Sequence, residues 1–270
     1  MGRGLFYGKK LDTFQATLTM SEMESIMTQA ERYVTTVSDQ LNAIRKTQWD
    51  SLRVGAEWIG EALLNDRWFY TFGTGHSRLL AEEVFHRAGG LARAVPILDD
   101  RIYFSAGAQQ ATDFERQQGT ALELMSDYPL QEGDVILVAS NSGRNALPIE
   151  MAMHAREKGL KVIALINVNH AKAWPSRHPS GKHLSDVSDL VLDNCGVQGD
   201  AAIEMTGIPG RVAATSTITG AYLVNLLIVA AVAHIQSKGG HPEVYISSNS
   251  DGDDHNAALA SKYRHHIKHL

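Results

Sequence analysis

Residues 134–159 read as a buried strand, a tight polar turn and a helix, and this order constrains the fold more than any other feature. The strand, Val135–Ala139, is continuously apolar, which is typical of a parallel strand covered on both faces. The first backbone N–H groups of a helix, together with its dipole, attract anions. The turn carries hydroxyl and amide groups that suit phosphate, on Ser140, Asn141, Ser142 and Asn145, with Gly143 among them. The segment therefore predicts an α/β fold that grips a small phosphorylated molecule.

A second loop of the same kind lies upstream. Residues 67–72 read as a strand and 78–88 as a helix, and the loop between them contains Thr74, Gly75, His76 and Ser77. One such glycine-containing loop is a weak signal, but two serine-bearing loops between strand and helix are much stronger. In an open parallel sheet both loops lie at the carboxyl edge, where ligands bind.

Strands and helices alternate through the middle of the chain. The predicted strands are Trp68–Phe72, Arg93–Leu98, Val135–Ser140, Lys161–Asn167 and Leu190–Asp193. The predicted helices between and after them span about 78–88, 109–126, 145–158 and 216–237. Apolar strands that alternate with amphipathic helices predict a three-layer αβα sandwich around a five-stranded parallel sheet.

The chain divides into four predicted segments. Residues 1–20 form a flexible leader, and 21–66 form N-terminal helices for oligomerisation, with an apolar stripe at Leu52, Ile59 and Leu63. Residues 67–237 form the ligand-binding core. Residues 238–270 form a tail that ends in a helix at about 256–268 and completes the site.

Composition limits the partners and the cellular location that we expect for the protein. The chain has 270 residues, is 44% hydrophobic and carries a formal net charge of −5, so no general affinity for nucleic acid is expected. Its one cysteine cannot form an internal disulfide, which fits a cytoplasmic protein. The longest apolar run, Ala221–Ile235, is shorter than the roughly 18 residues that span a bilayer, so we expect a buried helix and no membrane partner.

Three motifs resemble the signatures of the SIS (sugar isomerase) family. They are GTGHS at 73–77, SNSGRN at 140–145 and ATSTITGAY at 214–222. The stand-alone phosphosugar-binding branch, labelled phosphoheptose isomerase-like, is the most similar. The resemblance implies that Ser140, Ser142, Asn145, Ser216 and Thr217 hold a sugar phosphate or a similar anionic sugar, with Thr74, His76 and Ser77 nearby. It also implies a homodimer or homotetramer that needs no cofactor.

The expected reaction is aldose–ketose isomerisation through an enediol, for which one general base removes the proton from C2. Phosphoheptose isomerases place a histidine on the final helix, where this chain has Thr217 and Thr219. Other candidates are therefore needed. Glu115 is the first choice for the base and Glu83 the second. The candidates for ring opening or proton transfer are His86, His178 and His255.

Each candidate also has a purely structural interpretation. Asn145 suits a helix cap and Glu115 a helix start. Glu83 and His86, three residues apart on one helix, could pair with each other. No set of His, Cys and carboxylate residues has convincing metal-site spacing, so no metal is expected.

Three other functions stay open. The chain could sense a phosphosugar without converting it, or it could be an etherase or deaminase acting on amino-sugar phosphates, since both begin with the same proton abstraction. A dinucleotide site would use the loop with Gly73, Gly75 and Ser77, and the acid that binds ribose would come from the pair Asp99–Asp100. This interpretation leaves the loop at 140–145 unexplained.

Overall fold

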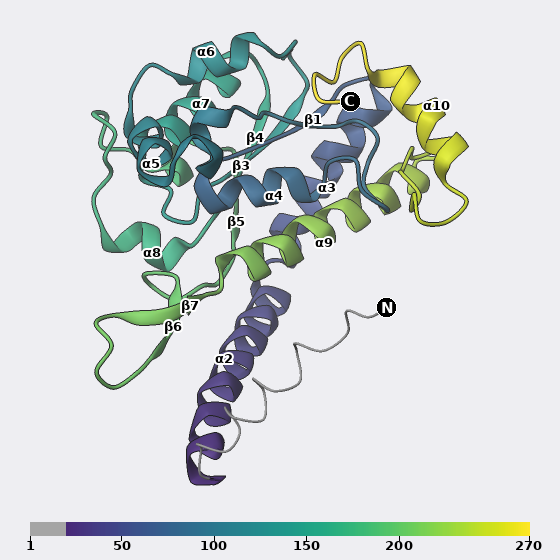
Figure 1. Ribbon diagram of the computed structural model, residues 1–270. Helices are drawn as coiled ribbons and strands as arrows, with labels where there is room; N and C mark the ends of the chain where they lie inside the picture. The colour runs from purple at the N-terminus through teal and green to yellow at the C-terminus, as the bar shows by residue number, and fades with distance from the viewer. Residues whose placement is uncertain (1–19) are drawn as a thin grey trace, which may run out of the picture.

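The computed structural model of the chain describes residues 20–270, and its centre is a five-stranded parallel sheet (Figure 1). In spatial order the strands are β2 (Ala94–Pro96), β1 (Phe69–Gly73), β3 (Val135–Ala139), β4 (Lys161–Ile166) and β5 (Leu190–Asp193). Every residue of β1 and β3 is buried, because both strands lie inside the sheet and are covered on both faces. The predicted fold class, an αβα sandwich preceded by N-terminal helices, is confirmed. The predicted leader falls almost entirely outside the described residues.

Helices cover both faces of the sheet. One face packs against α3 (Trp49–Leu64), α4 (Arg78–Glu83) and α9 (Ser216–Ser237). The other packs against α6 (Ala121–Ser126), α7 (Ala146–Glu157), α8 (Val168–Ala173) and α10 (Asp253–Tyr263), with α5 (Ala108–Arg116) alongside. Short 3-10 helices lie at η1 (Gly75–Ser77), η2 (Asp100–Ile102), η3 (Phe104–Ala106) and η4 (Leu184–Val187). Each face therefore has its own apolar core, and the sheet lies between the two.

The apolar stripe predicted as an oligomer interface is used within the chain. Leu52, Ile59 and Leu63 are at most 5% exposed and lie in the same core as α9. By length and composition α9 is apolar enough to cross a membrane, but its Leu223 and Leu227 are buried in that core. The assignment of the stripe to an interface was wrong, because packing on α9 removes these side chains from solvent.

The helix α2 (Met20–Thr47) extends away from the sheet, beside an antiparallel hairpin of β6 (Ala201–Glu204) and β7 (Arg211–Ala214) (Figure 1). The two are tied together by Tyr33, whose hydroxyl donates to the carbonyl oxygen of Ala214 at 2.7 Å. This hairpin was not predicted from the sequence. Among the side chains of α2 that the structure describes, the exposed large apolar ones are Ile26, Met27 and Val34.

Three predicted helices were wrong in extent. The helix expected over 78–88 ends at Glu83, and the one expected over 109–126 is divided into α5 and α6. The division falls around Gly119, whose φ of 78° lies in the left-handed region that glycine tolerates. The last helix, α10, also lies earlier than the predicted 256–268.

Candidate functional site

The two polar loops meet the start of α9 at the carboxyl edge of the sheet, around a small cavity. It measures about 10 Å³, roughly the room for one water molecule. Its lining is mainly hydroxyl, amide and imidazole groups, from His76, Ser77, Leu80, Asn141, Leu165, Asn194, Ser216 and Thr217. Five residues predicted to bind the ligand are thus brought together, namely His76, Ser77, Asn141, Ser216 and Thr217. A sugar phosphate would need this space to widen.

Asn194 is a lining residue that sequence reasoning missed. It follows β5 directly, and its Nδ2 donates to Oδ1 of Asn141 at 2.9 Å. Its Oδ1 accepts from the backbone N–H of Gly196 at 2.9 Å. The sequence did contain a signal for Asn194, because a polar residue directly after a parallel strand lies at the edge where ligands bind.

Asp200 occupies the start of α9. Its carboxylate accepts hydrogen bonds from the backbone N–H groups of Thr215 and Ser216, at 3.1 and 2.9 Å. It also accepts from the Ser216 hydroxyl at 2.7 Å. A carboxylate of the chain itself therefore binds where the sequence predicts a phosphate contact, as expected at the positive end of a helix.

The remaining loop residues do not line the cavity. The Ser140 hydroxyl accepts from the backbone N–H of Gly143 at 3.2 Å, so it closes the turn. Thr74 and Gly75 lead into η1, and a Cβ at Gly73 would collide with the carbonyl oxygen of Ser77. Ser142 and Gly143 lie in the turn before α7, also outside the cavity. These residues shape the loops that carry the lining side chains.

Asn145 connects the loop at 140–145 to Glu115 of α5. Its Nδ2 donates to Oε1 of Glu115 at 2.8 Å, and its Oδ1 accepts from Nη1 of Arg177 at 2.9 Å. Asn145 precedes α7 but makes no side-chain capping bond. The simple capping interpretation is therefore wrong, because both ends of the amide are engaged elsewhere.

His178 lies next to a buried carboxylate that sequence reasoning also missed. Its Nε2 is 3.6 Å from Oε1 of Glu150, a residue of α7 that is 8% exposed. Both carboxylate oxygens of Glu150 accept from the backbone N–H of Gly119, at 3.0 and 2.8 Å. Glu150 sits within an apolar helix, where a buried acid is unusual unless it is partnered.

Glu83 and His86 do not share a helix face, so that prediction was wrong. Glu83 is the last residue of α4, where it pairs with Arg87 and accepts from Nδ2 of Asn225 at 2.9 Å. His86 lies beyond the helix with a φ of 42°, and its ring is 4.6 Å from that of Tyr245. Neither side chain lines the cavity.

His255 lies on α10, at the end of the molecule opposite α8 and the β6–β7 hairpin (Figure 1). Its Nε2 is 2.9 Å from the carbonyl oxygen of Val244. It therefore does not approach the cavity within one chain.

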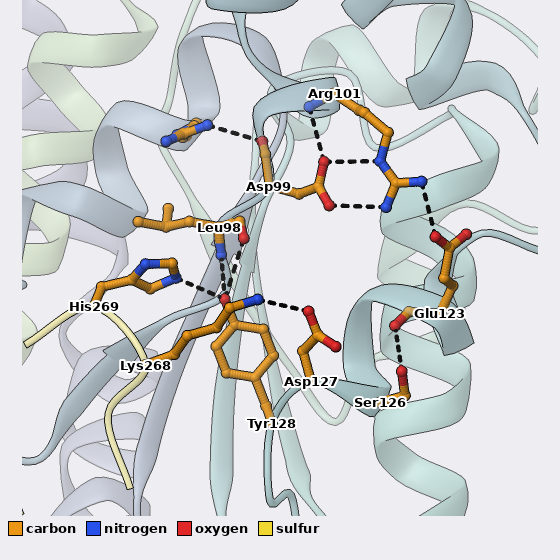
Figure 2. A network of polar contacts seen from close by, with 10 residues as sticks. Leu98, Asp99, Arg101, Glu123, Ser126, Asp127, Tyr128, Lys268 and His269 are labelled. Atoms are coloured by element: carbon orange, nitrogen blue, oxygen red, sulfur yellow. Dashed lines mark hydrogen bonds and ion pairs between the residues drawn. The ribbon is translucent and has the colours of Figure 1, made fainter. Parts of the chain in front are cut away.

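The tail instead reaches the carboxyl end of β2 through its final residues, as Figure 2 shows. Nε2 of His269 is 2.9 Å from the Tyr128 hydroxyl, and Lys268 pairs with Asp127 at 2.6 Å. Burial, followed by the charge of Lys268, lowers the pKa of His269. These residues adjoin a larger cavity of about 430 Å³, lined by Arg78, Leu98, Asp99, Asp100, Lys268 and His269.

Asp99, one of the two acids of the dinucleotide alternative, is held by Arg101 (Figure 2). Both its carboxylate oxygens accept from that guanidinium, at 2.9 and 2.8 Å, and this contact holds the pKa of Asp99 below its usual value. A carboxylate so engaged is poorly placed to bind ribose. Among residues 20–270 no three His, Cys, Asp or Glu side chains are grouped as a metal site.

Comparisons with known proteins agree with this architecture. Residues 32–167 match the SIS domain family. A UPF0309 protein of Halalkalibacterium halodurans is 38% identical over 236 residues, covering 87% of this chain and 94% of that protein. A UPF0309 protein of Listeria innocua is 39% identical over 228 residues, covering 84% and 92%. The phosphoheptose isomerase from Neisseria gonorrhoeae superposes with a TM-score of 0.51 at 18% identity, over 78% of this chain and 99% of that one.

Proposed function

Because this chain belongs to the SIS-domain family and, within it, to the UPF0309 proteins, we propose that it binds a sugar phosphate and interconverts its aldose and ketose forms. The observation that carries the proposal is the cavity at which Ser77, Asn141 and Thr217 converge from three separate elements. Hydroxyl and amide groups at the start of a helix suit a phosphate, because they add directed donors to the helix dipole.

The phosphate enters between the loop after β1 and the start of α9. Ser77 and Thr217 donate hydrogen bonds from their hydroxyl groups to the phosphate. The phosphate also replaces the Asp200 carboxylate as acceptor for the N–H groups at the start of α9. Asn194 holds the Asn141 amide in place through its bond at 2.9 Å. Anchoring the phosphate end of the sugar turns binding energy into orientation at the reacting carbons.

Glu115 is the proposed base. Among the described carboxylates, it is the one hydrogen-bonded to a side chain of the loop at 140–145. It removes the proton from C2 of the open-chain aldose while O1 takes up a proton, which gives an enediol. A proton is then delivered to C1 as the O2 hydroxyl loses its own proton and becomes the ketose carbonyl. Between the two steps the proton held by Glu115 exchanges with solvent. The Asn145 amide keeps the carboxylate oriented toward the loop over which the sugar extends.

His178 is the proposed group for opening the sugar ring. It lies beside Glu150, whose two oxygens are held by the backbone of Gly119. The carboxylate of Glu150, 3.6 Å from Nε2, holds the imidazole in position to pass a proton to the ring oxygen. Glu150 is thus a positioning residue, because it acts through His178.

A second candidate is a phosphosugar sensor without turnover. The Asp200 contact favours it, because a phosphate that displaces this carboxylate would move the segment leading into β6. An etherase or deaminase acting on an amino-sugar phosphate would use the same base, Glu115, since it begins with the same proton abstraction.

The proposed assembly is a cytoplasmic homodimer or homotetramer. Ile26, Met27 and Val34 expose apolar surface on α2, away from the sheet, and they are 55%, 58% and 63% exposed. A second copy would remove this surface from water, which favours association. No membrane or nucleic-acid partner is proposed.

The binding step is tested by calorimetry with a panel of aldose and ketose phosphates. At least one member should bind the wild-type protein, and the Thr217→Val variant should bind it about tenfold more weakly, since one bond to a charged group is lost. Ser237→Ala, at the opposite end of α9, is the matched control and should bind normally. If no sugar phosphate binds, the proposal is wrong.

A further inference from the structure

Three arginines lie near Asn145, and none of them lines the α9 cavity. Arg116 ends α5 beside Glu115, and Arg144 belongs to the loop itself. Arg177 donates a side-chain hydrogen bond to Asn145 at 2.9 Å, and its backbone N–H donates to the carbonyl oxygen of Arg144 at 2.8 Å. Three separate segments of the chain thus bring positive charge to one residue of the loop.

Other arginines of the protein are neutralised by ion pairs with carboxylates, and these three guanidinium groups are not. Arg53, Arg78 and Arg101 each form an ion pair with a neighbouring carboxylate. Within residues 20–270, Arg116 and Arg144 form no side-chain hydrogen bond or ion pair. The Nε of Arg144 is buried without a partner, and a buried donor left unpaired is costly.

The local charge balance is positive. Burial first, and then the charges of Arg116 and Arg144, lower the pKa of Arg177, while Glu115 acts in the opposite direction. Two neighbouring guanidinium groups and one carboxylate therefore act on Arg177. Folding brings these like charges together at a cost in free energy, and a bound oxyanion would relieve it.

We propose that Arg116, Arg144 and Arg177 bind a second anionic group of the ligand. The ligand is then a sugar with two oxyanions, a phosphate in the α9 cavity and a second phosphate or a carboxylate at the arginines. The guanidinium fork matches the oxygens of either group. The location of the first phosphate rests on the proposed function, whereas the arginine site stands on its own contacts.

Equilibrium dialysis with radiolabelled inorganic phosphate tests the second site directly. The wild-type chain should bind two phosphates. The double variant Arg144→Gln, Arg177→Gln should bind one, and Thr217→Val should bind one at the other site. Arg156→Gln is the matched control, because Arg156 lies on α7 but pairs with Asp189 at 3.0 Å, and it should bind two.

The outcomes separate the two proposals. A wild-type chain that binds one phosphate, unchanged by the arginine substitutions, overturns the second site and leaves the proposed function intact. Loss in the arginine variant with no loss in Thr217→Val overturns the α9 phosphate site and retains the arginine site.

The ligand class is tested with matched sugars, fructose 6-phosphate and fructose 1,6-bisphosphate. The wild-type protein should bind the bisphosphate at least about tenfold more tightly, and the arginine double variant should bind the two equally. Equal affinity for both in the wild-type protein contradicts the doubly anionic ligand. The melting temperature of each variant shows whether it is folded.

Discussion

Asp200 and Ser216 are joined by two hydrogen bonds, since the Asp200 carboxylate accepts from the Ser216 backbone N–H at 2.9 Å and from its hydroxyl at 2.7 Å. The positive end of α9 is therefore already paired with an anion. A ligand phosphate that binds there must displace this carboxylate, and its affinity is reduced by the free energy of that contact.

The substitution Asp200→Asn is expected to strengthen sugar phosphate binding about tenfold, because it removes a negative charge next to the phosphate. Asparagine keeps a side-chain oxygen that can accept from the Thr215 and Ser216 N–H groups, so the melting temperature should change little. Asp200→Ala removes the hydrogen bonds to the start of α9 as well and should cost about 1 kcal/mol of stability or more. Calorimetry on both variants checks this. Weaker binding by Asp200→Asn would mean that the carboxylate contacts the sugar instead.

Glu115→Gln should lower the rate of isomerisation by about 10² to 10⁴, the range typical of a lost general base. Glutamine can still accept the hydrogen bond from Asn145, so affinity for the sugar phosphate should stay within about twofold of wild type. Single-turnover assays and calorimetry separate the two effects. Asp113→Asn, on the same helix and bonded to Gln109 at 2.9 Å, is the control. Full activity in Glu115→Gln would exclude Glu115 as the base.

The five strands and the two polar loops were predictable, because a continuous apolar run such as Val135–Ala139 is a strong local signal. The loop residue His76 was placed at the carboxyl edge for the same reason, whereas Thr217, in the first turn of α9, was indicated only by the resemblance to SIS proteins. Parallel topology alone brings the carboxyl ends of the strands together.

What the sequence did not predict depends on contacts between distant segments. The break between α5 and α6 needs Glu150 to accept from Gly119, across 31 positions of the chain. The contact of Asp200 with the start of α9 joins residues 16 positions apart, across the β6–β7 hairpin, whose short strands lack a clear apolar alternation. Secondary-structure propensity and hydrophobic periodicity depend on residues that are close along the chain. Neither therefore indicates a contact between distant residues.

His266 makes the stability of the protein depend on pH. Its ring stacks on Trp68 with centroids 3.6 Å apart, and its Nε2 lies 2.8 Å from the Tyr70 hydroxyl. Burial, and then the charge of His265, lower the pKa of His266 from 6.5 to about 4. Between these values the unfolded chain binds a proton that the folded chain does not, so stability falls as pH drops from 6.5 to 4.

The melting temperature of wild type should therefore fall more steeply than that of His266→Phe between these two pH values. Phenylalanine keeps a ring against Trp68 but cannot be protonated. Above pH 6.5 the difference between the two proteins should be constant, because the imidazole is then neutral in both states. Parallel curves throughout the range would show that His266 does not titrate with a lowered pKa.

Val34→Glu should dissociate the proposed oligomer. Val34 is 63% exposed on α2, and a charge placed in an apolar interface is costly to desolvate. Light scattering after size-exclusion chromatography should show the mass of one chain, 29.5 kDa, for this variant and a multiple of it for wild type. Leu122→Glu changes a side chain on α6 that is 52% exposed and should leave the mass of the wild-type assembly unchanged. A wild-type protein of 29.5 kDa would contradict the oligomer.

The central claim is that this site forms an enediol from a bound sugar phosphate. Proton NMR in D₂O, with the same panel of aldose and ketose phosphates, tests it most directly. We predict that at least one sugar loses its C2 proton signal as an aldose, or a C1 proton signal as a ketose, and that Glu115→Gln abolishes the exchange. If sugars that raise the melting temperature keep every carbon-bound proton signal, the isomerase account is contradicted and a binding protein without turnover replaces it.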